Sequence, residues 1–151
     1  MSQESIPGRG ISPFLKLMNK IPGWMAEHNI GKINRQILVL ETQGRRSGKP
    51  HKVPLGWVEL EDRIYVVAAR GRQTDWLRNA LAGGAVRITR AGRTTHIRPQ
   101  VVEDLSRKEA VVRAYVARYP QAADRLFASA GSADPAVAAQ RVGILDVSRR
   151  H

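Results

Sequence analysis

The residue types most suited to chemistry gather in one short stretch, residues 42–55, which is rich in cations and glycine. Its basic side chains are Arg45, Arg46, Lys49 and Lys52, and His51 is a further hydrogen-bond donor. No acidic residue lies between Glu41 and Glu59. Gly44 and Gly48 predict a permissive backbone with unshielded N–H groups. Guanidinium groups beside backbone N–H groups suit an anion, so the stretch predicts an anion-binding turn, with a solvated basic hairpin as the alternative.

Length and composition predict a single domain without metal or disulfide bonds. The 151 residues are enough to bury a core, and we expect one domain over 1–151 with a flexible segment 1–11. Cysteine is absent and the four histidines are scattered, so we expect no metal site. The net charge of +12 predicts a negatively charged partner. Because the sequence shows neither a signal-peptide pattern nor a long apolar run, we expect a cytoplasmic protein.

The elements that must position the basic turn are predicted from apolar periodicity. Apolar residues recur at three- and four-residue intervals over 14–25, which predicts an N-terminal helix starting near Ser12-Pro13. We expect this helix to pack on the core, and peripheral membrane contact is the alternative. Three apolar runs around the turn predict an antiparallel meander. These runs are 37–42, 51–60 and 64–69, with a hairpin at 61–63 between the last two.

Further along the chain, short helices alternate with another hairpin. Thr74 or Asp75 predicts the cap of a helix over 75–81, and a hairpin is expected over 85–102. Ser106 with Glu109 fits a capping box that begins a helix ending near Tyr119. A weak helix over 121–130, a further turn over 135–139 and a strand over 142–147 complete the chain. Five or six short strands with helices at the ends predict an antiparallel barrel of the α+β class.

Several catalytic designs are missing from the sequence. There is no nucleophile elbow and no dinucleotide fingerprint, and Gly48-Lys49 is followed by Pro50 rather than the Ser or Thr of a phosphate loop. Acidic residues are too sparse in the central half to nominate a catalytic carboxylate pair, and no catalytic residue is assigned. An enzyme built from these residues is therefore expected to use a bound cofactor for the chemistry.

Two patterns resemble a known family. Residues 42–55 read Thr-x-Gly-Arg-Arg-Ser-Gly-x-x-His-x-x-Pro-Leu, which is similar to the signature turn of the deazaflavin-dependent nitroreductase family. Residues 76–82 resemble the family's Trp-x-x-Asn-x-x-Ala helix, and Arg70-Gly71 falls where the family has a basic glycine-containing loop. The resemblance extends from the N-terminal helix to about Val102 and is weak beyond Glu103.

The resemblance implies a fold, a cofactor and a set of site residues. The fold would be a split antiparallel β-barrel of about six strands with an N-terminal helix, a short mid-chain helix and C-terminal helices. The cofactor would be coenzyme F420, whose phosphate and oligoglutamate tail are anionic, with FMN as the alternative. The phosphate and tail would be held by Arg45, Arg46, Ser47, Gly48, His51, Lys52 and Arg70. The ring would lie by Pro54, Leu55, Ala68 and Ala69, and Trp76 and Asn79 would brace the site.

The chain departs from the family pattern at several positions. His51 stands where the family has arginine, which makes a permanent cationic contact weaker and predicts pH-dependent anion binding. Gly56 stands where nitro-drug-reducing members carry an aromatic residue, and residues 121–141 lack the tyrosines that some members place over the substrate. Simple core packing is an equally good interpretation of Trp76.

The implied activity is hydride transfer to an electron-poor acceptor such as a quinone, an enone or a nitro compound. A carrier of flavin, deazaflavin or haem without turnover is one alternative. A basic nucleic-acid-binding barrel is another, although Trp57 and Tyr65 are the only aromatic residues in the predicted strands, so we expect no specific nucleic acid partner. Monomer and homodimer both remain open.

Overall fold

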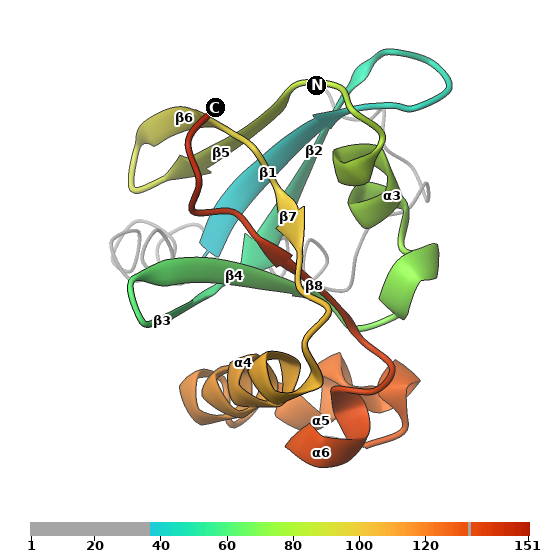
Figure 1. The fold of residues 1–151 in the computed structure, drawn as a ribbon, viewed down its shortest axis with the longest axis vertical. Helices are drawn as coiled ribbons and strands as arrows, with labels where there is room; N and C mark the ends of the chain where they lie inside the picture. Colours follow the sequence, from blue (N-terminus) through green and yellow to red (C-terminus); the bar gives the residue numbers. More distant parts are fainter. Residues whose placement is uncertain (1–36, 133) are drawn as a thin grey trace, which may run out of the picture.

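The computed structural model describes residues 37–132 and 134–151, which form two four-stranded antiparallel sheets and several helices (Figure 1). The predicted N-terminal helix, its proposed membrane contact and segment 1–11 lie outside these residues. The sheets and the segregated helices confirm the α+β class. None of the helices in the described ranges is both long enough and apolar enough to cross a bilayer.

The first sheet carries the basic turn and has the strand order β2-β1-β5-β6. Its strands are β1 (Ile37–Gln43), β2 (Pro50–Gly56), β5 (Val86–Arg90) and β6 (Arg93–Ile97). Leu38, Leu40 and Thr42 are buried along β1 and the residues between them are more exposed, which is the two-residue period of a strand with one face on a core. Gln43 pairs with Pro50, so residues 44–49 form the turn between β1 and β2.

The second sheet has the order β3-β4-β8-β7 and joins the middle of the chain to its end. Its strands are β3 (Val58–Leu60), β4 (Arg63–Ala68), β7 (Gln100–Val101) and β8 (Gly143–Asp146). All four residues of β8 are buried. Leu145 belongs to the core between the two sheets, whereas Ile144 belongs to the core between the second sheet and the C-terminal helices. Both faces of this sheet are therefore covered.

The prediction of one meander was wrong, because the run over 51–60 is two strands in different sheets. The chain leaves the first sheet after Gly56 and enters the second at Val58. Between them, the Trp57 amide donates to the Tyr119 hydroxyl oxygen at 3.0 Å, and the same hydroxyl donates to the Trp57 carbonyl at 2.8 Å. A side chain 62 residues away thus replaces the neighbouring strand at this position.

Two tight turns adopt the backbone predicted for hairpins. Glu61 and Asp62 have φ values of 51° and 65° between β3 and β4. Ala91 and Gly92 have φ values of 51° and 77° between β5 and β6. Positive φ at both central residues is the pattern of a type I′ turn, whose twist matches the flanking strands.

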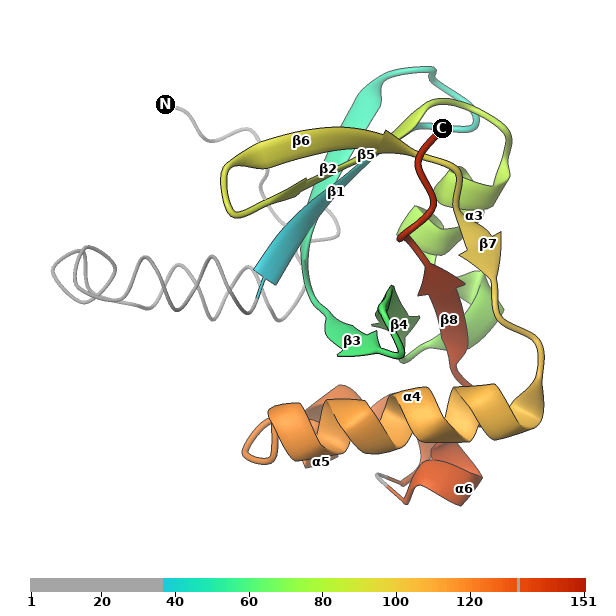
Figure 2. The ribbon, with the colours of Figure 1, turned by 60° about the vertical axis from the view of Figure 1, so that its left-hand side comes forward.

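Most of the helical segments lie at one end of the molecule, whereas α3 and the short η2 before it lie beside the sheets (Figures 1 and 2). The helical segments are η2 (Gly71–Gln73), α3 (Asp75–Leu81), α4 (Leu105–Arg118), α5 (Ala123–Leu126), η3 (Ala128–Ala130) and α6 (Pro135–Ala138). The predicted bounds of α3 are confirmed. The predicted capping box of α4 was wrong, because its N-cap is Asp104, whose carboxylate accepts from the Arg107 amide at 2.9 Å.

Candidate functional site

The basic turn over 44–49 is closed by its own hydrogen bonds. The Gly44 amide donates to the Lys49 carbonyl at 2.7 Å, and the Gly48 amide donates to the Gly44 carbonyl at 2.8 Å. The Lys49 amide donates to Ser47 Oγ at 3.1 Å. Gly48 has a φ of 72°, a conformation that favours glycine. The prediction that Gly44 and Gly48 offer unshielded N–H groups was therefore wrong, since both amides already have acceptors.

Arg45 attaches this turn to helix α3. Its backbone amide donates to Asn79 Oδ1 at 3.2 Å, and its Nη1 donates to the same oxygen at 2.7 Å. Its Nη2 lies 3.2 Å from Asp75 Oδ1. Asn79 is 8% exposed, and its side-chain carbonyl has these two donors, as a buried amide requires. Arg45 and Asn79 are thus brought together, with the arginine committed to holding the turn on α3.

The remaining basic residues of the stretch 42–55 differ in whether their side chains already contact other residues. Arg46 and Lys49 are exposed and form no ion pair within the described residues. Lys52 Nζ lies 3.8 Å from Glu41 Oε1, and Glu41 also pairs with Arg87. The His51 ring lies against Gly44, where an added Cβ would be 2.8 Å from His51 Nε2. Arg46 and Lys49 are therefore the cations of the turn that remain available to a ligand.

The donor set of the turn fits an anionic group. Within 37–132 and 134–151, the amides of Arg46 and Ser47 have no hydrogen-bond acceptor. They lie in the same turn as the exposed side chains of Arg46 and Lys49. Backbone N–H groups beside a free guanidinium and an ammonium suit a phosphate or carboxylate group.

An apolar cavity of about 50 Å³ lies by the other end of β2. Its walls come from β2, β4, α4, α5 and the residues that directly follow β4 and α5, and they consist of Leu55, Gly56, Val67, Ala69, Tyr115, Leu126 and Phe127. Two residues that were predicted to lie by the ring, Leu55 and Ala69, are among them. Pro54 and Ala68 are buried and do not line this cavity, and Ala68 belongs to the core between the sheets.

Tyr115 of α4 and Tyr119, the residue that follows α4, cover Gly56 next to this cavity. The Tyr115 hydroxyl donates to the Gly56 carbonyl, and the Tyr119 hydroxyl is bound to the backbone of Trp57. Burial raises the pKa of both hydroxyls above the ordinary tyrosine value, so both are neutral. Sequence reasoning missed Tyr115, Leu126 and Phe127, which lie beyond the two patterns that carried the predicted family resemblance. The four-residue spacing of the two tyrosines was the available signal that they share one helix face.

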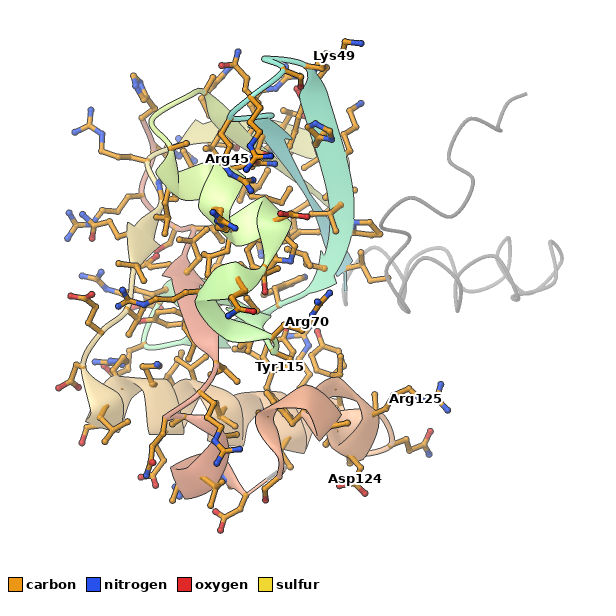
Figure 3. The ribbon with its side chains drawn as sticks, turned by 90° about the vertical axis from the view of Figure 1, so that its right-hand side faces the viewer. Arg45, Lys49, Arg70, Tyr115, Asp124 and Arg125 are labelled. Carbon is orange, nitrogen blue, oxygen red and sulfur yellow. The ribbon has the colours of Figure 1, made fainter. Side chains whose placement is uncertain are left out.

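Two further predicted site residues, Trp76 and Arg70, lie near α3 and η2. Trp76 is half-buried and packs on the core, as its alternative interpretation predicted. Arg70 is exposed and directly precedes η2. Figure 3 shows Arg45 and Lys49 at the upper end of one face, and Arg70 and Tyr115 lower on it, near α4.

A larger cavity, of about 310 Å³, contains none of the predicted site residues. Its walls include Arg63, Arg107 and Asp146. Arg63 Nη1 lies 3.0 Å from Asp146 Oδ2, and Arg107 Nη2 lies 3.1 Å from Glu61 Oε2. Because both arginines are already paired, this cavity matches the predicted anion less well than the turn does.

Comparison with solved structures supports the fold assignment. An F420-H2 dependent reductase, FDR-A, is 22% identical with a TM-score of 0.56 over 75% of this chain and 94% of that chain. A protein described as a domain-swapped dimer is 19% identical, with a TM-score of 0.56 over 82% and 96%. The conserved hypothetical protein Rv2991 from Mycobacterium tuberculosis is 13% identical, with a TM-score of 0.58 over 83% and 80%. At these identities the similarity confirms the predicted fold class alone.

Comparison with protein families identifies the family of the chain. Among curated proteins, none matches this sequence. The sequence model of the F420H(2)-dependent quinone reductase family matches residues 23–129, which is more than half of the 151 residues. This match confirms the predicted relationship to deazaflavin-dependent reductases. The chain therefore belongs to the F420H(2)-dependent quinone reductase family, a family of oxidoreductases whose coenzyme is F420.

Proposed function

We propose that this chain binds reduced coenzyme F420 along the face shown in Figure 3 and reduces a quinone. The observation that supports this best is the placement of an anion-binding turn and an apolar cavity at opposite ends of β2. Leu55 lies five residues beyond Pro50, which corresponds to about 17 Å along an extended strand. This separation suits a coenzyme with an anionic tail at one end and, at the other, a ring that lies against Leu55 outside the cavity.

The residues present fit the coenzyme. The turn supplies Arg46, Lys49 and the amides of Arg46 and Ser47 for a phosphate and acidic tail. Leu55 and Ala69 supply an apolar wall for a ring, and Arg45 and Asn79 fix the turn in place. FMN is the alternative ligand, because a phosphate on a similar ring satisfies much of the same turn. Family membership favours F420.

The protein's part in the reaction is positioning. When bound, the reduced deazaflavin supplies a hydride in one two-electron step, so the site must hold acceptor and ring close together. The quinone gains this hydride and one proton and leaves as the hydroquinone. Since the hydroxyls of Tyr115 and Tyr119 are bound to backbone groups, we assign the proton to water rather than to these side chains.

The surroundings of Gly56 favour quinones over nitro compounds. A Cβ at this position would lie 3.2 Å from Tyr119 Cζ and 3.3 Å from the Tyr115 hydroxyl oxygen. An aromatic side chain, as in the nitro-drug-reducing members, has no room here. The acceptor surface is instead formed by residues of α4 and α5.

A turnover assay tests the proposal. Purified protein is mixed with reduced F420 and a quinone, an enone or a nitroaromatic compound, and oxidation of the coenzyme is followed by its absorbance. We expect saturable turnover that is fastest with the quinone. Competitive titration of F420 and FMN distinguishes the two cofactors. Absence of saturable F420 binding contradicts the proposal, and tight binding without reduction of any acceptor favours the carrier function.

The burial of two aromatic side chains adds to the case against the nucleic-acid alternative, whose support is the net charge of +12. Trp57 is 7% exposed and Tyr65 is 2% exposed, so neither ring is available for stacking on a base. Trp57 is instead enclosed by Arg118 and Arg90, whose guanidinium carbons lie 4.3 Å and 4.7 Å from the ring centroid. Salt-resistant binding to a defined oligonucleotide is the result that would revive this alternative.

A further inference from the structure

The cavity beside Leu55 is too small for an aromatic ring. Its volume is about 50 Å³, whereas an engineered apolar cavity that binds benzene in another protein measures about 150 Å³. A volume of 50 Å³ still exceeds the roughly 15 Å³ needed for one water molecule. The cavity is therefore suited to a group of one or two carbon atoms.

The cavity is also apolar. Leu55, Val67, Leu126 and Phe127 supply hydrocarbon walls. The polar group of Tyr115 is directed to the Gly56 carbonyl, with which it forms a hydrogen bond. A water molecule needs two or more polar partners, so a short alkyl group is the better occupant.

The position of the cavity links it to the acceptor. Two of its residues, Leu55 and Ala69, are among the four predicted to lie by the coenzyme ring. A quinone ring stacked on the coenzyme ring beside Leu55 and Ala69 would have its substituents at the entrance of the cavity. The far wall comes from Tyr115 of α4 and from Leu126 and Phe127 at the end of α5.

We propose that this cavity receives a methyl- or ethyl-sized substituent of the quinone and that Leu126 sets the size limit. This inference rests on the proposed function and adds the substituent class of the substrate. Burial of one methyl group predicts a preference of about fourfold in kcat/KM over the unsubstituted quinone. A tert-butyl group exceeds the cavity and is expected to lose this advantage.

The test compares 1,4-benzoquinones that carry hydrogen, methyl, ethyl or tert-butyl. Leu126→Ala enlarges the cavity, and Leu105→Ala is the matched control, because Leu105 is 52% exposed on α4 and does not line the cavity. For each quinone, the kcat/KM of the variant is divided by that of the unchanged protein, which cancels the intrinsic reactivity of the quinone. We expect this ratio to rise at least threefold from methyl to tert-butyl for Leu126→Ala and to stay constant for Leu105→Ala.

A ratio that is constant across the series for Leu126→Ala overturns the inference. Binding without turnover gives an independent readout, in which calorimetry measures the affinity of the corresponding hydroquinones. We expect the same size order, tightest for methyl or ethyl, and affinities independent of substituent size also overturn the inference. If F420 binds but no quinone is reduced, the proposed function fails, while the hydroquinone series still decides the role of the cavity.

Discussion

Replacement of Asn79 by alanine is predicted to release the basic turn from α3. Asn79 Oδ1 accepts from the Arg45 amide at 3.2 Å and from Arg45 Nη1 at 2.7 Å. Within the described residues, no other side chain accepts from both of these donors. Because alanine offers no acceptor, both donors lose their partner, and the partly buried arginine must turn to water.

The expected loss of stability in Asn79→Ala follows from these two hydrogen bonds. A neutral hydrogen bond contributes about 1 kcal/mol and one from a charged donor about 1.5–3 kcal/mol. The Arg45 side chain is 23% exposed, which allows water to replace part of the lost interaction. We therefore expect the free energy of unfolding to fall by about 2–3 kcal/mol, and the affinity for F420 to fall as the turn loses its fixed position.

Urea unfolding and F420 titration of the same variants provide the measurement. Asp75→Ala is the matched control, because Asp75 is the other partner of the Arg45 guanidinium. The Asp75 side chain is 84% exposed. Such an exposed ion pair contributes at most about 1 kcal/mol. The reasoning is refuted if the free energy of unfolding of Asn79→Ala lies within about 0.5 kcal/mol of that of the unchanged protein, which is the size of a neutral surface substitution. It is also refuted if Asp75→Ala lowers the free energy of unfolding as much as Asn79→Ala does.

The remaining predictions concern Gly56 and Tyr115. Gly56→Ala places a Cβ 3.2 Å from Tyr119 Cζ and should lower the free energy of unfolding, measured in urea, by about 1–3 kcal/mol. An unchanged free energy of unfolding would contradict this prediction. Burial raises the pKa of Tyr115 above the ordinary 10.0, so its contribution is complete below pH 10 and is lost as the pH rises further, because the unfolded chain ionises first. Tyr115→Phe should therefore reduce the alkaline loss of stability by up to about 1.4 kcal/mol per pH unit, and parallel curves for both proteins would contradict this.

Local signals predicted the elements whose causes are local. The helix over 75–81 was predicted within its bounds because Thr74 precedes its first residue and the glycines 83–84 follow its end. The hairpin at Glu61 and Asp62 was predicted because its two turn residues are flanked by apolar runs. The family resemblance also implied that Asn79 braces the site, and in the structure its side-chain oxygen accepts from Arg45.

The missed features depend on residues distant in sequence. The break between β2 and β3 comes from the Tyr119 hydroxyl, which binds the backbone of Trp57 across 62 positions. The far wall of the apolar cavity comes from α4 and α5, so no pattern around Leu55 could reveal it. Ser106 and Glu109 fitted a capping box, yet Asp104, two residues earlier, caps α4. The structure favours the earlier carboxylate because it reaches the Arg107 amide at 2.9 Å.

The most direct test of the anion-binding turn is a fluorescence titration of coenzyme F420 with the unchanged protein and with an Arg46→Ala, Lys49→Ala double variant. Both side chains are exposed and form no ion pair within the described part of the chain, so their removal leaves the fold unperturbed. We predict saturable binding by the unchanged protein and a Kd at least about tenfold higher for the variant, since each charge-assisted contact is worth about 1.5–3 kcal/mol. Equal Kd values for the two proteins would contradict the assignment of this turn to the coenzyme's phosphate and tail.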